Sequence, residues 1–477
     1  MNRFIEIILA LAVVGTTLAF GGVQTITFSI MEVVVFALLL VLLIKQTRDK
    51  QIQLPLPIWP ILFVAFVALQ LVPLPASMLE MISPPRSADL ASIPGTTWAP
   101  ISVYPRETWV ELVKVLAYLS AFALAAYVSD LRKNPSFLVR LLILLGLVEA
   151  AYGIVQYLTG WQQIFTYVKK YDLEEATGTF INRNHFAGHL ELVIPFVLAA
   201  GFHAFEKWAR DPRSFRGNQE TGDRTSWGWQ AGFCAFLLVL LAVAMLFSRS
   251  RMGILVGLTT ILLMSVLAQL KVWHKSWLLS LLGFLIVVMV YGLWIGLGPV
   301  LQRFESVADP KFMTMESRVA IWSDVLRMVR DFPLVGSGLG TFETVYRQYQ
   351  TTQVNYLVDH AHNDYLEFAT DTGILGAVLL FVPIFYLLGK MILAFLDDPR
   401  SYRRSVTLGC IGSTFAILSH SLTDFNLQIP ANTLSLAVIL GIGYRVAILD
   451  RHKEEEGWAS PVSGANHGQS AAAGRPN

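Results

Sequence analysis

The sequence of 477 residues contains few charged residues and few cysteines, and its net charge is small. Asp, Glu, Lys and Arg make up 15% of it, whereas soluble proteins average about 25%. A soluble chain of this length would divide into several domains and would need charged surface for each of them, so this composition disfavours a soluble protein. The net charge of +2 provides no basic field for nucleic acid.

The two cysteines, Cys234 and Cys410, both fall inside apolar runs. This placement argues against a disulfide framework and against a zinc site built from thiolates. The first apolar run, 5–20, follows a single basic residue, Arg3, and a second run begins within a few residues. We therefore interpret it as a spanning helix and not as a cleaved signal peptide.

Long apolar runs are abundant instead: 54% of the residues are hydrophobic, and the mean hydropathy is +0.55. A bilayer core needs about 20 apolar residues of helix. The expected fold is all-α: a polytopic membrane protein with about 12 transmembrane helices and a large external loop that contains short amphipathic helices. The predicted spans are 4–20, 26–44, 57–74, 109–128, 137–158, 186–205, 230–247, 252–270, 277–296, 373–395, 405–420 and 431–448.

Basic residues in the short loops predict the orientation. The loops 45–50, 130–136, 206–229, 271–275 and 397–404 are basic, and all fall on one side when the helices are counted. Basic loops mark the cytoplasmic side, which both termini join. The predicted organisation is nine helices in 1–296, an external loop in 297–372, three helices in 373–448 and a disordered cytoplasmic tail in 449–477.

Within the large external loop, one segment has the pattern of an amphipathic helix. Val319, Trp322, Leu326 and Val329 recur at helical spacing, and Pro333 follows as a stop signal. We expect this helix to lie at the membrane surface on that apolar face.

Arginines stand where two helices enter from the external side. Arg183 precedes the sixth predicted span, and Arg249 and Arg251 precede the eighth. Arginine is unfavourable beside the positive end of a helix dipole unless an anion is bound there. The guanidinium fork suits phosphate oxygens, so two such helix starts could hold a diphosphate. Alternatively, these arginines reach the membrane surface or neutralise nearby acids.

The segment "DHAHND" (359–364) allows three interpretations. The H-x-H-x-D order is typical of a binuclear metal site, but Tyr365 follows where a further histidine is usual. His362 could instead cap or pack at the membrane surface. In the third interpretation His362 is a general base, because an imidazole is largely neutral near pH 7. The other external-side histidines have no recognised metal-ligand spacing: His185, His189 and His420.

Ionisable residues inside the predicted spans must face protein or water. Lys114 follows Glu111 by three residues, a spacing that permits a local ion pair. Glu149 and Glu191 either line an acceptor groove or pair within the bundle, and the sequence leaves both possibilities open.

His362-Asn363, nine residues, Gly373, two residues and Gly376 form an H-N-x9-G-x2-G pattern. This pattern, together with "GTFINRN" (178–184), "SRSR" (248–251) and "FPLVGSGLGTF" (332–342), resembles the O-antigen ligase and polymerase superfamily of bacterial inner membranes. The resemblance covers 178–376 by motif and the whole chain by topology.

The resemblance implies about twelve helices, a large periplasmic loop, and transfer of glycan from undecaprenyl diphosphate with inversion and without metal, nucleotide or other cofactor. It implies that His362 is the essential histidine and that Arg183 and Arg251 flank the diphosphate, with Arg249 as a further candidate. We add Arg318, which opens the predicted amphipathic helix. The supporting residues expected around them are Asn184, His360, Asn363, Asp364 and Tyr365.

The predicted function is therefore glycan transfer to an acceptor hydroxyl on the periplasmic face of the inner membrane, with lipid A-core as the first-choice acceptor. A polymerase of O-antigen or exopolysaccharide and a protein O-oligosaccharyltransferase would use the same chemistry. A secondary transporter, or a non-catalytic partner of a polysaccharide assembly complex, is a more distant alternative. A transporter would concentrate its functional residues in broken midplane helices, whereas here they gather in loops and helix starts.

Overall fold

The computed structural model describes residues 1–50, 54–129, 131, 136–210, 221–271, 315–351 and 357–451. This part of the chain is mostly helical. Its sheet is confined to two antiparallel pairs of two-residue strands. In one pair β1 (Leu74–Pro75) meets β2 (Trp98–Ala99), and in the other β3 (Gln163–Ile164) meets β4 (Tyr167–Val168).

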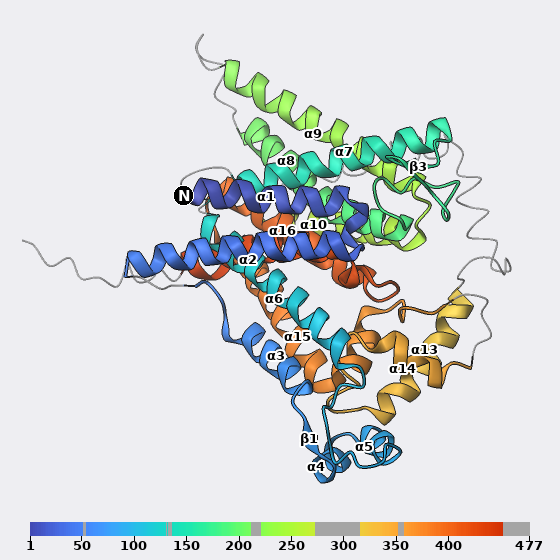
Figure 1. Cartoon of the computed structure of the whole chain (residues 1–477). Helices are drawn as coiled ribbons and strands as arrows, with labels where there is room; N and C mark the ends of the chain where they lie inside the picture. Colours follow the sequence, from blue (N-terminus) through green and yellow to red (C-terminus); the bar gives the residue numbers. More distant parts are fainter. Residues whose placement is uncertain are drawn as a thin grey trace, which may run out of the picture.

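The long helices run side by side in one bundle (Figure 1). Among the described residues, eight helical segments are long and apolar enough to cross a membrane. Seven of them belong to α2 (Thr25–Arg48), α6 (Pro105–Val128), α7 (Phe137–Thr159), α8 (Arg183–Arg210), α9 (Thr221–Phe247), α10 (Arg251–Lys271) and α15 (Asp364–Asp397). The eighth is α17 (Pro430–Tyr444), which continues through η3 (Arg445–Leu449).

Three further predicted spans are helices of the same bundle. α1 (Asn2–Leu18) has 17 residues and α3 (Ile58–Gln70) has 13, so both are short for a bilayer core. α16 (Ser401–His420) has 20 residues, but it begins with Arg403 and Arg404 in its first turn. The predicted span 277–296 and the predicted tail beyond 451 lie outside the described residues. The described helices thus support a polytopic membrane protein, and the number twelve stays a prediction.

Local signals in the sequence account for several helix ends. Ser136 caps α7 through its Oγ, which accepts from the Val139 amide at 3.3 Å, and Gly160 ends this helix in the left-handed conformation. Pro105 and Pro430 stand at the first position of α6 and α17, where the missing amide costs no helical hydrogen bond.

Helix α8 lies at the centre and packs on α7, α9, α10 and α16. Glycines on α16 let this neighbour approach closely: a Cβ on Gly409 would lie 2.3 Å from the Phe196 ring. At the far end of the same helix pair, Arg404 forms a two-pronged ion pair with Glu206, with Nη2 at 2.7 and 2.9 Å from the two carboxylate oxygens. Small residues and a paired charge therefore join these helices.

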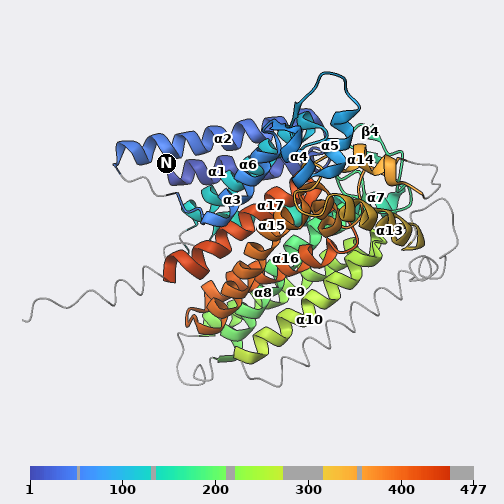
Figure 2. The ribbon, with the colours of Figure 1, turned by 90° about the horizontal axis from the view of Figure 1, so that it is seen from below.

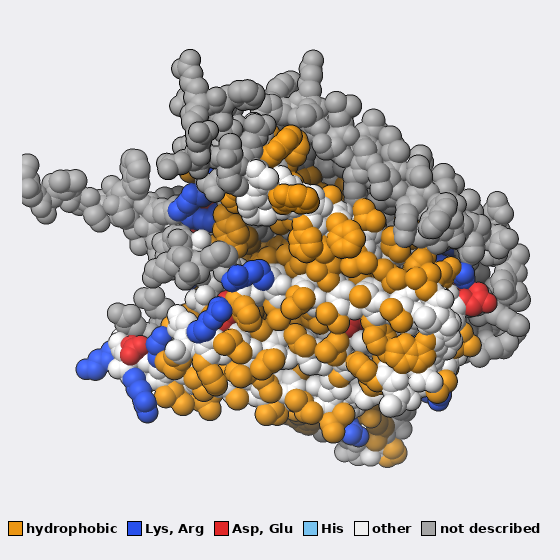
Figure 3. All heavy atoms as spheres, turned by 90° about the horizontal axis from the view of Figure 1, so that it is seen from above, with side chains coloured by type: hydrophobic (Ala, Val, Ile, Leu, Met, Phe, Trp, Pro, Cys, Tyr) orange, Lys and Arg blue, Asp and Glu red, His pale blue; other side chains and the backbone are white. Residues whose placement is uncertain are grey.

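The connecting segments 71–104, 160–182, 332–351, 357–363 and 421–429 gather at one end of the bundle, which we call the loop end (Figures 1 and 2). They carry the short helices α4 (Ala76–Ile82), α5 (Pro84–Ala91), α14 (Phe342–Tyr349) and η2 (Asn426–Gln428), with α13 (Met315–Asp331) beside them. On the face in Figure 3, hydrophobic side chains cover the middle, and Lys and Arg gather mainly at the end with the N-terminus.

Helix α13 forms where the amphipathic pattern predicts it, but its buried face differs from the prediction. Val319 and Leu326 are 55% and 48% exposed, whereas Ile321, Val325 and Met328 are fully buried. The other two predicted positions are partly buried. The reason is that α13 packs against α14 and α15 instead of lying on a flat surface. Burial of each such side chain stabilises by about 1.5–3 kcal/mol.

Helix α15 begins at Asp364, earlier than the expected start at 373, and bends at Gly373. Gly373 has φ 65° and ψ −179°, a conformation open essentially to glycine alone. A Cβ there would lie 2.3 Å from the Leu334 carbonyl. The amides after the bend donate to the carbonyls of Pro333 and Leu334, at 2.9 and 3.3 Å. The connector after α13 therefore supplies carbonyl acceptors to the amides that lose their helical partners at the bend.

Candidate active site

The candidate site is organised around Asp424, in the loop between α16 and α17. Its side chain is 1% exposed. Oδ2 accepts from Asn184 Nδ2 at 2.6 Å and from Arg318 Nη2 at 3.4 Å. Oδ1 lies 3.8 Å from His185 Nε2 and 3.7 Å from His362 Nδ1. One carboxylate thus brings together α8, α13 and the loop before α15.

Asp424 is ionised at neutral pH. Burial alone would raise the pKa of its carboxyl, but His362, Arg318 and His185 hold that pKa well below its ordinary value. The Phe425 amide adds a hydrogen bond to Oδ1 at 2.9 Å. A buried carboxylate with these partners is a fixed negative charge beside the His362 ring.

His362 is 12% exposed and adopts a left-handed backbone conformation, with φ 48°. This conformation is uncommon for a residue other than glycine and often marks a functional position. Its Nδ1 faces Asp424 at 3.7 Å, a distance for charge interaction but too long for a hydrogen bond. Nε2 is on the opposite edge of the ring, so Asp424 and a substrate could engage different nitrogens.

The residues after His362 tie its loop to the end of α16 and the loop that follows. Asn363 caps α15 by accepting from the Leu366 amide at 3.1 Å and donates from Nδ2 to the Leu422 carbonyl at 2.9 Å. Ser421 Oγ donates to Asp364 Oδ2 at 2.6 Å. The Tyr365 hydroxyl donates to the Leu418 carbonyl at 2.8 Å. These supporting residues hold the backbone of His362 close to Asp424.

His360 has a different environment. Its Nδ1 lies 2.7 Å from Glu367 Oε1, and its ring stacks on Phe425 with centroids 4.1 Å apart. Burial lowers the pKa of His360, but the Glu367 carboxylate outweighs this and raises the pKa to about 9. His360 is therefore a cation at neutral pH and is unsuited to act as a base.

Two of the predicted arginines pair with nearby acids. Arg183, the first residue of α8, places Nη1 2.6 Å from Glu175 Oε1 and 3.7 Å from Asp172 Oδ1. Arg249 reaches Glu174 Oε2 at 3.1 Å. The guanidinium of Arg249 also lies 5.6 Å from the centroid of the Tyr157 ring. The structure therefore shows the alternative that the sequence left open, in which Arg183 and Arg249 neutralise nearby carboxylates.

Arg251 opens α10 and lies within electrostatic range of Arg183 and Arg318, whose positive charges act on it. We call Arg183, Arg251 and Arg318 the arginine cluster. Its members come from three different helices, and Arg318 connects it directly to Asp424. Like charges gathered in this way favour an anion between them.

The remaining polar residues singled out in the sequence pair within the bundle. Glu149 accepts from the Thr179 amide and hydroxyl at 2.8 and 2.7 Å, and Glu191 lies 3.0 Å from His420 Nδ1. Lys114 and Glu111 form the expected local pair at 2.6 Å. Glu149 and Glu191 are buried and thus pair within the bundle, which is one of the two possibilities that the sequence left open.

Two observations bear on the metal interpretation. Among the residues that the structure describes, no group of three or more His, Cys, Asp or Glu side chains has the arrangement of metal ligands. His189, one of the external-side histidines, packs on the Phe180 ring with centroids 5.4 Å apart.

Sequence reasoning did not identify Asp424 or Glu367. Asp424 lies 62 residues after His362 in the chain, as their numbers show, so no local spacing connects the two. One signal was present: Asp424 is the only acid in the short segment between the last two apolar runs, 421–430. A lone carboxylate between two buried helices must find a partner.

The fold and the site define a polytopic membrane protein in which a His–Asp pair lies beside an arginine cluster. Residues 236–381 match the family model described as O-antigen ligase. This match over part of the chain supports the O-antigen ligase superfamily and agrees with the resemblance found in the sequence. The segment contains Arg249, Arg251, Arg318 and His362, whereas Asp424 lies beyond it. A comparison with curated proteins gives no match.

Proposed function

We propose that this protein is an inverting, metal-independent glycosyltransferase that moves a glycan from undecaprenyl diphosphate to an acceptor hydroxyl. The first-choice acceptor is lipid A-core, and the loop end faces the periplasm from the bacterial inner membrane. The observation that carries the proposal is the contact of 3.7 Å between His362 Nδ1 and the buried Asp424 carboxylate, next to the arginine cluster.

In the proposed reaction His362 takes the proton of the acceptor hydroxyl. The hydroxyl oxygen then forms a bond to the anomeric carbon while the bond from that carbon to the diphosphate breaks. The electron pair leaves with the diphosphate, so the leaving group needs no proton. A single displacement of this kind inverts the anomeric centre. Asp424 stabilises the imidazolium as it forms, because its negative charge is already in place.

The arginine cluster is suited to the leaving diphosphate. Arg251 is acted on by the charges of Arg183 and Arg318, and a bound anion would replace this repulsion by attraction. The ion pair with Glu175 orients Arg183 before substrate arrives. Orientation in advance lowers the cost of stabilising the charge that develops on the diphosphate.

The test is reconstitution of the purified protein in lipid bilayers with an undecaprenyl-diphosphate glycan, in the presence of EDTA. Lipid A-core, a glycan chain and a peptide are offered as acceptors side by side. The wild type should transfer, and His362→Ala should not, although it should still fold and bind the donor. Normal product from His362→Ala would refute the base, and a loss of activity in EDTA that zinc restores would refute metal independence.

The acceptor arms also decide between related activities. Product on lipid A-core supports a ligase, product on a glycan chain supports a polymerase, and product on the peptide supports a protein O-oligosaccharyltransferase. All three use the same imidazole and arginines, so His362→Ala should abolish whichever product the wild type makes.

A further inference from the structure

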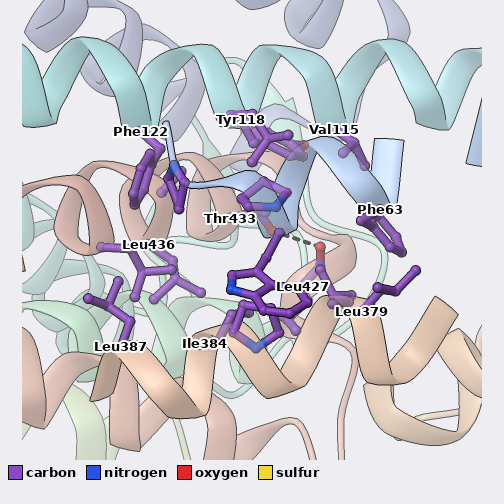
Figure 4. A pocket seen from close by; sticks show the side chains of 18 of the residues that line it. Phe63, Val115, Tyr118, Phe122, Leu379, Ile384, Leu387, Leu427, Thr433 and Leu436 are labelled. Carbon is purple, nitrogen blue, oxygen red and sulfur yellow. Dashed lines mark hydrogen bonds between the residues drawn. The ribbon is translucent and has the colours of Figure 1, made fainter. Parts of the chain in front are cut away.

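An apolar pocket of ≈ 290 Å³ lies between α3, α6, α15 and α17 (Figure 4). Its volume is near the lower end of the range for ligand pockets, about 300–1,000 Å³. Side chains from all four helices form the walls, among them Phe63, Val115, Leu379, Ile384 and Leu436. The lining is mostly apolar, with Glu111, Gln428 and Thr433 among its few polar residues, so it suits a hydrocarbon chain better than a sugar or a phosphate.

One end of the pocket lies next to the candidate site. Leu427, three residues after Asp424, lines the pocket, and its amide donates to Asp364 Oδ2 at 3.1 Å. Phe368, on the first turns of α15, lines it as well. The pocket is therefore continuous with the elements that hold His362.

The pocket also reaches the apolar outer surface of the bundle. Trp59 on α3 and Tyr386 on α15 belong to its lining and are 48% and 55% exposed. Their neighbours Ile61 and Val382 are exposed apolar side chains of the same helices. A chain lying in the bilayer could reach these exposed lining residues without crossing polar surface.

The position of the pocket relative to the arginine cluster indicates which chain it takes. Arg183 and Arg251 open α8 and α10, and none of the lining residues comes from 137–271. The pocket thus lies among α3, α6, α15 and α17, apart from the helices that begin with the two arginines. A donor held by Arg183 and Arg251 would therefore leave this pocket free.

We propose that the pocket binds a hydrocarbon chain of a lipid-anchored acceptor and so brings the acceptor hydroxyl to His362. This inference rests on the proposed function and narrows it, because it excludes a peptide as the natural acceptor. The carrier chain of the donor and ordinary bilayer lipid are the competing occupants.

The experiment fills the pocket from α15. Ile384→Trp places a larger side chain in the lining, and Leu393→Trp, at an exposed position of the same helix outside the lining, is the matched control. Transfer from the undecaprenyl-diphosphate glycan is measured to lipid A-core and to the oligosaccharide obtained from it by deacylation. Ile384→Trp should raise KM for lipid A-core at least about tenfold, because a few methylene groups lose their burial. KM for the deacylated acceptor and for the donor should change less than about twofold.

Each other outcome overturns the inference in a recognisable way. If Ile384→Trp raises KM for the donor, the pocket holds the carrier chain of the donor. If it changes no KM, the pocket holds ordinary bilayer lipid. If Ile384→Trp does not fold, Leu436→Phe fills the pocket from α17.

A lipid A-core with a photoreactive acyl chain tests the wild type directly. It should label the lining at Leu379 or Leu436, and unlabelled lipid A-core should compete, whereas phosphatidylglycerol should not. Competition by phosphatidylglycerol, or labelling elsewhere only, would overturn the inference. Failure of the wild type to transfer to any acceptor would refute the proposed function itself, while the label would still report the pocket.

Discussion

Replacement of Asp424 by Asn is the sharpest test of the His–Asp pair. Asp424→Asn keeps the shape of the side chain and an oxygen that Asn184 can bond, but it removes the negative charge that faces His362. This variant therefore distinguishes two roles of Asp424. If Asp424 serves packing only, the isosteric change should have a small effect, and if it serves catalysis, kcat should fall strongly.

The expected size follows from the distance. Two unit charges about 4 Å apart interact by about 4 kcal/mol at an effective dielectric constant of about 20. His362 Nδ1 and Asp424 Oδ1 are 3.7 Å apart, and both side chains are largely buried. If about half of the proton has moved in the transition state, about 2 kcal/mol is lost, which lowers kcat about 30-fold. Complete transfer would double this energy.

The assay is steady-state transfer by protein in lipid bilayers, normalised to the folded fraction, because Arg318 also loses an ion pair. Asp331→Asn, at the opposite end of α13 from Arg318, is the matched control and should keep kcat. The double variant His362→Ala with Asp424→Asn should be no slower than His362→Ala alone. A kcat for Asp424→Asn within about twofold of the wild type would refute the reasoning, since the charge at this distance must be felt.

Three further predictions concern the arginine cluster, the bend in α15 and His360. Arg251→Ala should weaken binding of the lipid diphosphate at least about tenfold in a direct binding assay, whereas Arg327→Ala should not; equal affinities would remove Arg251 from the donor site. Gly373→Ala should lower the free energy of unfolding by about 1–3 kcal/mol, whereas Gly389→Ala, with open space around its Cβ, should not lower it; equal melting temperatures would contradict the strain argument. The pKa of His360 is raised to about 9 from 6.5, so its contribution to stability is complete below about pH 6.5 and lost as pH rises through about 9. His360→Gln should remove this loss from thermal melts, and an unchanged pH dependence would contradict it.

Much of the bundle is predictable from the sequence because each span is a continuous apolar run, and a run of that length leaves few alternatives to a helix. The loop carrying His362 and the helix starts at Arg183 and Arg251 can also be predicted from the sequence, because the motifs that mark them are short and local. The structure then places Arg318 close to Arg251, although the two belong to different helices.

What the sequence could not supply depends on contacts between distant segments. Asp424 acquires its partners only when the α16–α17 loop meets α8 and α13, so nothing near it in the chain indicates a role. The buried face of α13 is another example. Its two candidate stripes are both apolar, and the choice between them is made by α14 and α15, which cover Ile321 and leave Val319 exposed.

The early start of α15 has a consequence for the length of acceptor that the proposed site could accommodate. Helix α15 carries the cap next to His362 at its beginning and, beyond the bend at Gly373, the pocket wall at Leu379 and Ile384. At 1.5 Å per residue, the 15 residues from Asp364 to Leu379 would span about 22 Å in a straight helix, and the bend at Gly373 changes the direct distance. If the pocket holds a hydrocarbon chain of the acceptor, α15 fixes the distance between that chain and the imidazole of His362. Only an acceptor whose hydroxyl and hydrocarbon are separated by a matching length can reach both ends at once.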